Sequence, residues 1–231
     1  FIAAALQRGR KCKGMLQDIS PHVYDNAYHP RPPRKEDMVL VYGEDAAHLK
    51  QGADGGLTIP TYGEMVELAA GMKVEYVYLF SIDEIAFFLF FTFQPLKKLG
   101  LVKKPVQFFR EYQPAWLGFA AITGYQLGKW YHEHKFCGKC GSKTGRSNTE
   151  RAIGCPLCGT IVYPKLSPAV SVGILDGHRM LLTRSAGRPG RHYALVSGAV
   201  ESGGTLAEAV RRGVMEGEGV RGKTIACLTS R

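Results

Sequence analysis

The sequence predicts an α+β protein with an N-terminal α/β domain, a small cysteine-rich ribbon and a C-terminal region of strands followed by a helix. Four of the six cysteines form two CxxC pairs, a helical pattern precedes them, and a strand, a hairpin turn and a glycine-rich loop follow them. The chain has 231 residues, of which 45% are hydrophobic and 22% charged. It is therefore long and apolar enough to bury a core.

Five segments are expected along the chain. Residues 1–14 are basic and begin with phenylalanine, so we expect an upstream or non-native segment. Residues 15–112 form the N-terminal domain, 113–135 a connecting helix, 136–164 the ribbon, and 165–231 a partial C-terminal domain.

The N-terminal domain mixes strand signals with turn clusters. Met38–Tyr42, MVLVY, predicts one strand, whereas residues 61–93 are ambiguous between helix and strand. Residues 85–93, IAFFLFFTF, are about half as long as a membrane-spanning helix. This run therefore predicts a buried strand or helix, and we expect no membrane partner. Pro114 near the start of 113–135 suits the first turn of a helix.

The secondary-structure signals after the cysteines are stronger than those in the N-terminal domain. Residues 170–174 alternate apolar and small side chains, which predicts a half-buried strand. Asp176–Gly177 indicates a hairpin turn, with Met180–Leu182 as the return strand. A glycine-rich loop over Ser197–Gly204 leads to Thr205–Glu208, TLAE, which matches a capping box and predicts the start of a helix.

The cysteines predict one structural zinc ion. Their spacing is C-x2-C-x14-C-x2-C, formed by Cys137, Cys140, Cys155 and Cys158. Two residues between cysteines let both thiolates meet one tetrahedral ion, and four thiolates leave no open position for catalysis. A redox CxxC pair is the alternative. The pattern is typical of a metal site in a reducing compartment, so we expect a cytoplasmic protein.

The net charge is +10 and the pI is about 9.4. Such a charge favours anionic partners such as phosphates, nucleotides or RNA. An unspecialised basic surface is the alternative, because the lysines and arginines are spread along the chain. Among the basic residues Lys135, Lys139, Lys143 and Arg146 the aromatic residue is Phe136, which is thin support for base stacking.

The stretch Gly198–Val220 resembles the Nudix box. Six residues are in register with the box, namely Gly198, Arg212, Val214, Glu216, Gly219 and Val220. Three glycines stand where the box has glutamate, namely Gly204, Gly213 and Gly217. On a helix, positions 213, 216 and 217 share one face.

The resemblance extends to the NAD(H) pyrophosphatase branch of the Nudix hydrolase family. The cysteine pairs with Val162–Pro164, the lead-in Ala194–Gly198, and the segments Tyr125–His132 and Met15–His22 are all similar to that branch. The resemblance covers roughly residues 15–220. It implies a truncated Nudix-type mixed-sheet domain after the ribbon.

This resemblance also implies an activity. Family members hydrolyse the diphosphate of NAD(H) to AMP and nicotinamide mononucleotide, some act on NAD-capped RNA, and the reaction uses Mg²⁺ or Mn²⁺. A homodimer is also implied. Carried over by position, Tyr163 contacts substrate, the backbone carbonyl of Ser197 and the side chain of Glu216 hold the metal, and Arg212 orients the loop or a glutamate.

The departures from the family predict an impaired enzyme. Gly213 and Gly217 offer no side-chain ligand, and Glu216 has an alternative role as a helical i,i+4 partner of Arg212. Only 66 residues run from Leu166 to Arg231, so the C-terminal half of the Nudix domain is expected to be missing. We therefore expect little or no hydrolase activity. The alternatives are a non-catalytic nucleotide- or RNA-binding zinc-ribbon protein, or a fragment without independent function.

Overall fold

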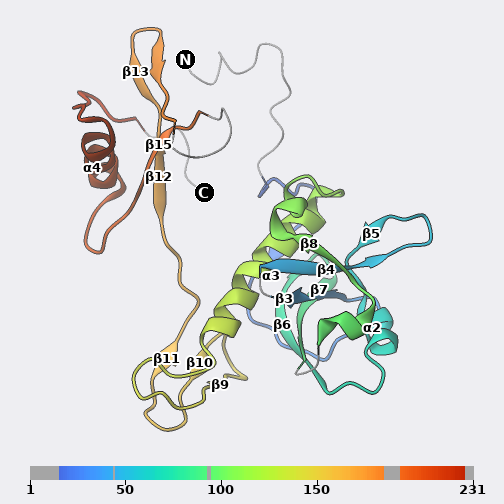
Figure 1. Cartoon of the computed structure of the whole chain (residues 1–231). Helices are drawn as coiled ribbons and strands as arrows, with labels where there is room; N and C mark the ends of the chain where they lie inside the picture. Colours follow the sequence, from blue (N-terminus) through green and yellow to red (C-terminus); the bar gives the residue numbers. More distant parts are fainter. Residues whose placement is uncertain (1–15, 44, 93–94, 185–192, 227–231) are drawn as a thin grey trace. The chain divides into compact units, whose positions relative to one another are not determined.

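The computed structural model describes residues 16–43, 45–92, 95–184 and 193–226. They form two compact units, within residues 1–164 and 165–231 (Figure 1). Each unit is described by itself.

A four-stranded sheet forms the centre of the first unit. Its strand order is β1 (Tyr24–Asp25), β6 (Val74–Ile82), β7 (Ile85–Thr92) and β2 (Met38–Leu40). Strands β6 and β7 form an antiparallel hairpin, and β2 runs parallel to β7. At the hairpin turn Asp83 has φ 52°, the left-handed conformation that aspartate tolerates better than bulky residues. The stretch that the sequence left ambiguous between helix and strand is thus mainly this hairpin over its described residues 61–92.

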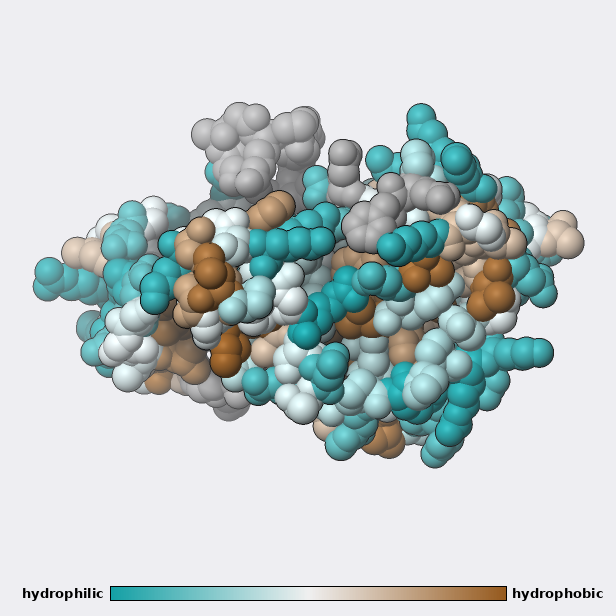
Figure 2. Space-filling view, turned by 90° about the horizontal axis from the view of Figure 1, so that it is seen from below, coloured by the Kyte–Doolittle hydropathy of each residue, from teal (hydrophilic) through white to brown (hydrophobic). Residues whose placement is uncertain are grey.

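The apolar run over 85–93 is a buried strand in its described part. Phe87, Phe88 and Phe90 of β7 are at most 4% exposed. No helix among the described residues is long and apolar enough to cross a membrane. On the face shown in Figure 2, hydrophobic residues form separate patches between hydrophilic ones.

The strand expected over Met38–Tyr42 is divided between two sheets, so the expectation of one strand was wrong. Residues up to Leu40 pair with β7, whereas Tyr42 begins β3 (Tyr42–Gly43) of the second sheet. Val41 lies between them and is 2% exposed, so the chain changes sheets inside the core. The second sheet also contains β4 (Ala46–Gln51), β5 (Leu57–Thr58) and β8 (Val102–Pro105).

Two short 3₁₀ helices and helix α2 accompany these sheets. The 3₁₀ helices span Leu96–Leu99 and Val106–Arg110, and α2 spans Tyr62–Leu68. A capping box begins α2, because Thr61 accepts from the backbone of Glu64 and the Glu64 side chain accepts from the backbone of Thr61.

Helix α3 (Ala115–Glu133) confirms the connecting helix expected over 113–135. It packs closely on the central sheet at two glycines. A Cβ atom at Gly124 would overlap the side chain of Leu40, and one at Gly128 would lie 3.2 Å from Leu89 Cδ1. The absence of side chains at these positions lets the helix lie directly on the sheet and lead into the ribbon (Figure 1).

The ribbon is a three-stranded antiparallel sheet joined to the main core. Its order is β11 (Ile161–Val162), β10 (Ile153–Gly154) and β9 (Gly145–Arg146). Ile153 is 3% exposed and belongs to the same hydrophobic cluster as Leu79 of β6. Ribbon and central sheet therefore share a core.

Two strand pairs and one helix form the second unit in its described part, residues 165–184 and 193–226. β12 (Ala169–Val172) pairs antiparallel with β15 (Val196–Ala199), and β13 (Ile174–Asp176) forms a hairpin with β14 (Arg179–Leu181). The hairpin turns at Gly177, φ 60°, as the sequence predicts. Helix α4 (Leu206–Glu218) packs on β15 and β12. Its expected capping box is confirmed by the bonds between Thr205 and Glu208.

Candidate functional site

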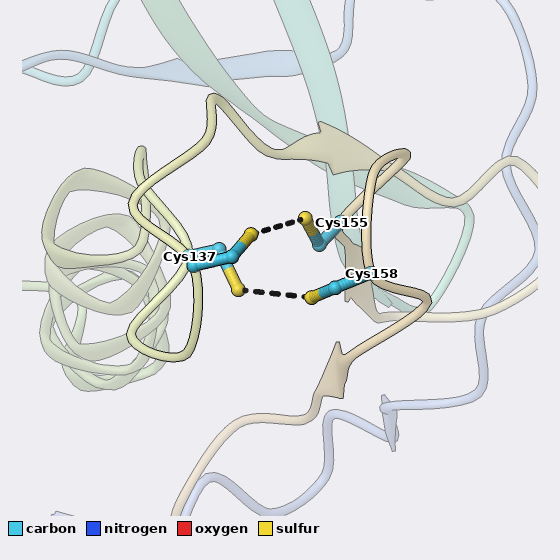
Figure 3. A group of neighbouring side chains, drawn as sticks. Cys137, Cys155 and Cys158 are labelled. Carbon is cyan, nitrogen blue, oxygen red and sulfur yellow. Dashed lines mark hydrogen bonds between the residues drawn. The ribbon is translucent and has the colours of Figure 1, made fainter.

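The four cysteines of the ribbon converge on one point. Their sulfur atoms all lie within 4.8 Å of one another, and two cross-knuckle pairs are close, with Sγ–Sγ distances of 3.6 Å for Cys137–Cys158 and 3.5 Å for Cys140–Cys155 (Figure 3). A tetrahedral ion with Zn–S bonds of about 2.3 Å separates its sulfur ligands by about 3.8 Å. The spacing of the sulfurs therefore fits one zinc ion with four thiolate ligands.

Backbone hydrogen bonds shape both knuckles in the same way. Gly141 N–H donates to the carbonyl of Cys137, and Gly159 N–H donates to the carbonyl of Cys155, at 2.8 and 3.0 Å. Both glycines have positive φ, 74° and 71°, which suits residues without a side chain. The repeated turn brings each pair of thiolates to the same side of its knuckle.

Local donors favour the thiolate at two of the four cysteines. The backbone N–H groups of Cys140 and Lys139 lower the pKa of Cys137. The hydroxyl and N–H groups of Thr160 lower the pKa of Cys158 to about 6. At Cys155 the backbone N–H of Cys158 lowers the pKa, but burial and the neighbouring thiols of Cys140 and Cys158 act the other way and raise it to about 11. Thiolates are the form that binds zinc, so the sulfur geometry, and not the pKa values, carries the assignment of the site.

A second candidate site lies in the C-terminal unit between β15 and α4. It is an open pocket with a volume of about 350 Å³. Its walls come from the strand, the following loop and one face of the helix. The lining residues are Val196, Ser197, Gly198, Ala199, Glu201, Arg212, Gly213, Glu216 and Gly217.

The helix presents the expected face to this pocket. Positions 213, 216 and 217 all line it, as their i, i+3, i+4 spacing predicts. Glu208 and Glu218 are not among the lining residues, and Glu208 is occupied by the capping box at the start of α4. Glu201, from the loop after β15, is a wall residue that the motif alone did not assign.

The sequence left open whether Arg212 contacts the loop or a glutamate, and in the structure it contacts both. One guanidinium nitrogen donates to the carbonyl of Ala199 at 2.7 Å, which ties the helix to the loop after β15. Its Nε lies 4.0 Å from Oε1 of Glu216, one helical turn away. Glu216 is therefore a neighbour of the arginine as well as a pocket wall, and its side chain is 70% exposed.

The pocket fits a divalent cation poorly, because Glu201 and Glu216 are the two carboxylates among its lining residues. Glu216 is the one carboxylate of α4 that lines it, and a cation beside Glu216 would be repelled by the guanidinium of Arg212. Among the described residues, the four cysteines are the group of three or more His, Cys, Asp or Glu side chains close enough to hold a metal.

Tyr163 belongs to the first unit and is not among the residues that line the pocket. It follows β11 in the N-terminal unit, is 52% exposed, and donates from its hydroxyl to the carboxylate of Glu150 at 3.1 and 3.2 Å. This contact with Glu150 raises the pKa of Tyr163. The predicted substrate contact of Tyr163 stays a prediction.

Two family models match the second half of the chain. Residues 132–163 match the NADH pyrophosphatase zinc ribbon domain, and residues 165–231 match the NUDIX domain. The first match contains all four converging cysteines, and the second contains the pocket between β15 and α4.

Similar proteins include several named NAD-capped RNA hydrolase NudC. The one from Chromobacterium violaceum is 38% identical over 106 residues, 46% of this chain and 40% of the relative. The one from Stutzerimonas stutzeri is 40% identical over 104 residues, which are 45% of this chain and 36% of the relative. The one from Salmonella heidelberg is 38% identical over 118 residues, which are 51% of this chain and 46% of the relative. Each match thus spans less than half the length of the relative.

Proposed function

We propose that this chain, which combines the zinc ribbon and the NUDIX domain of the NAD(H) pyrophosphatase branch of the Nudix family, acts on the diphosphate of NAD(H) or a related dinucleotide. The observation that carries the proposal is the pocket between β15 and α4, because the residues of the Nudix box line it. The products of hydrolysis would be AMP and nicotinamide mononucleotide. The relatives named NAD-capped RNA hydrolase support a dinucleotide cap on RNA as a further substrate.

The roles of the protein groups follow from their contacts. Arg212 fixes the loop after β15 by holding the Ala199 carbonyl, so the backbone of Ser197 and Gly198 forms a fixed wall. The four cysteines would hold a structural zinc ion that braces the ribbon. The family's reaction uses Mg²⁺ or Mn²⁺, and the pocket supplies one helical carboxylate for it. We therefore expect slow hydrolysis, and we also propose the homodimer that the family resemblance implies.

The test combines binding and turnover on the zinc-loaded chain. NADH binding would be measured by calorimetry, and AMP release would be followed chromatographically with Mg²⁺ or Mn²⁺. We expect saturable binding with slow AMP release, and loss of both in Arg212→Ala, because the loop is no longer tied to α4. Neither binding nor release in the unaltered chain would overturn the proposal.

A second candidate function is non-catalytic binding of nucleotide or RNA. Its support is the net charge of +10 together with two exposed aromatic side chains on the ribbon, Phe136 at 66% and Tyr163 at 52% exposed. Exposed aromatic rings beside cations suit base stacking. Saturable NADH binding without any AMP release would favour this candidate over hydrolysis.

A further inference from the structure

Two of the three glycines that stand where the Nudix box has glutamate face the pocket directly. Gly213 and Gly217 both line it, one turn apart on α4. An added Cβ atom at Gly213 would lie 3.8 Å from Gly198 Cα, and one at Gly217 would lie 3.7 Å from Val196 Cγ1. These are ordinary van der Waals distances, so the backbone already accommodates larger residues at both positions.

The third glycine has a different environment. Gly204 precedes the N-cap Thr205, and it is not among the residues that line the pocket. A Cβ atom at Gly204 would lie 3.3 Å from the carbonyl oxygen of Glu201, which is a tight contact with backbone. A carboxylate at Gly204 would therefore start from a position outside the pocket wall.

The helix face as it stands is poor in negative charge. Glu216 lies between the two glycines, and Arg212 Nε is 4.0 Å from its carboxylate. The guanidinium offsets the charge that would attract a cation. Glutamates at 213 and 217 would place three carboxylates at i, i+3 and i+4 around one face. Hard divalent cations such as Mn²⁺ and Mg²⁺ prefer such clusters of carboxylate oxygens.

We propose that Gly213 and Gly217, and not Gly204, are the residues that make this pocket a poor site for a divalent cation. The proposal rests on the assignment of the pocket as the Nudix-type site. It concerns cation binding alone, so it can succeed or fail separately from hydrolysis.

The experiment is a Mn²⁺ titration of the zinc-loaded protein, with free Mn²⁺ followed by electron paramagnetic resonance. Zinc occupies the thiolates throughout, because soft sulfur ligands favour it over Mn²⁺. We expect weak, non-saturating binding by the unaltered chain and by Gly204→Glu. The double variant G213E/G217E should bind one further Mn²⁺ at least about tenfold more tightly, since the tenfold step corresponds to one strong added interaction.

A matched control separates ligand chemistry from helix stability. The double variant G213A/G217A also removes both glycines from α4 and raises helix propensity, but it adds no carboxylate. It should bind Mn²⁺ like the unaltered chain. Circular dichroism on all variants verifies that α4 is retained.

Three results would overturn the proposal. They are Mn²⁺ binding by the unaltered chain within tenfold of G213E/G217E, equal gains in Gly204→Glu, or equal gains in G213A/G217A. If G213E/G217E binds Mn²⁺ as expected, the cation proposal is supported even where neither this variant nor the unaltered chain releases AMP from NADH. That combination would overturn the proposed hydrolysis and leave the cation inference standing.

Discussion

At the scale of single residues, the buried carboxylate of Asp37 organises the N-terminal unit. Asp37 is 1% exposed and accepts two hydrogen bonds from Arg31, at 2.6 and 2.7 Å. It also accepts from the backbone N–H groups of Arg34 and of Ala86 on β7. Burial raises the pKa of Asp37, but the bonds from Arg31, Arg34 and Ala86 outweigh burial, and the pKa lies below its usual value.

This arrangement predicts acid sensitivity. Because the folded-state pKa of Asp37 is depressed, its contribution is fully present above the unfolded value of about 3.9 and is lost as the pH falls through the folded value. Asp37→Asn should lower the free energy of unfolding by about 3 kcal/mol at pH 7, since Arg31 loses its partner, and should weaken this acid dependence. Urea unfolding at several pH values measures both effects.

The control for this prediction is Asp54→Asn. Asp54 is exposed and accepts only a local bond from the backbone of Gly56. Its replacement should change the free energy of unfolding by no more than about 0.5 kcal/mol. Equal stability of the Asp37 and Asp54 variants at pH 7 would show that the buried pair contributes nothing net.

At the scale of elements, the ribbon is fastened to the central sheet by two arginines. Arg151 donates to the carbonyl of Leu79 in β6 and lies over the ring of Tyr28, with its Cζ 5.6 Å from the ring centroid. Arg146 lies over Phe91 at 4.4 Å and forms an ion pair of 3.0 Å with Glu75. Since strands of two residues cannot build their own core, the zinc ion and these anchors must hold the ribbon together.

Zinc removal is therefore expected to loosen the central sheet as well as the ribbon. A strong zinc chelator with a thiol reductant should lower the hydrogen-exchange protection of β6 amides by about tenfold or more, because the contact to Leu79 is worth about 1–3 kcal/mol. In Arg151→Ala the same treatment should change β6 much less. The exposed Lys143→Ala serves as the control and should behave like the unaltered chain. Unchanged β6 protection after zinc removal would contradict the coupling.

Local signals predicted elements well. The Thr205–Glu208 capping box, the Asp176–Gly177 turn and the helix over 113–135 all depend on neighbours in the sequence, and all three are confirmed. Thr61–Glu64 carries the same T-x-x-E signal, so the start of α2 was predictable but was left ambiguous. The pocket-facing side of α4 was likewise predictable, because helical spacing alone places positions 213, 216 and 217 together.

Features that depend on distant contacts were not predictable in this way. The passage of the chain between two sheets at Val41 follows from burial on all sides, which a run of apolar residues does not reveal. The contact of Arg151 with Leu79 joins residues 72 positions apart. An arginine in a ribbon ordinarily suggests a solvated or nucleic-acid-binding cation, so its partner had to come from the tertiary structure.

At the scale of the whole molecule, the net charge is +10, and three exposed lysines lie in the ribbon and at the residue just before it. These are Lys135, Lys139 and Lys143, whereas Arg146 and Arg151 are engaged with the central sheet. Lys135 and Lys143 flank Phe136, whose backbone forms a bridge with that of Lys143. If RNA binds the ribbon, these lysines should supply the phosphate contacts.

Their contribution can be measured through the salt dependence of binding. Each phosphate contact on single-stranded nucleic acid adds about 0.7 to the slope of log affinity against log salt concentration, so replacing all three lysines by alanine should reduce the slope by about 2. Fluorescence anisotropy with a labelled RNA at several salt concentrations gives this slope. The matched control replaces Lys73, Lys97 and Lys98, which are exposed lysines outside the ribbon, and removes the same charge. Because diffuse attraction depends on net charge alone, equal losses in both triple variants would mean that RNA does not select the ribbon, whereas a loss confined to the ribbon variant would locate the contact there.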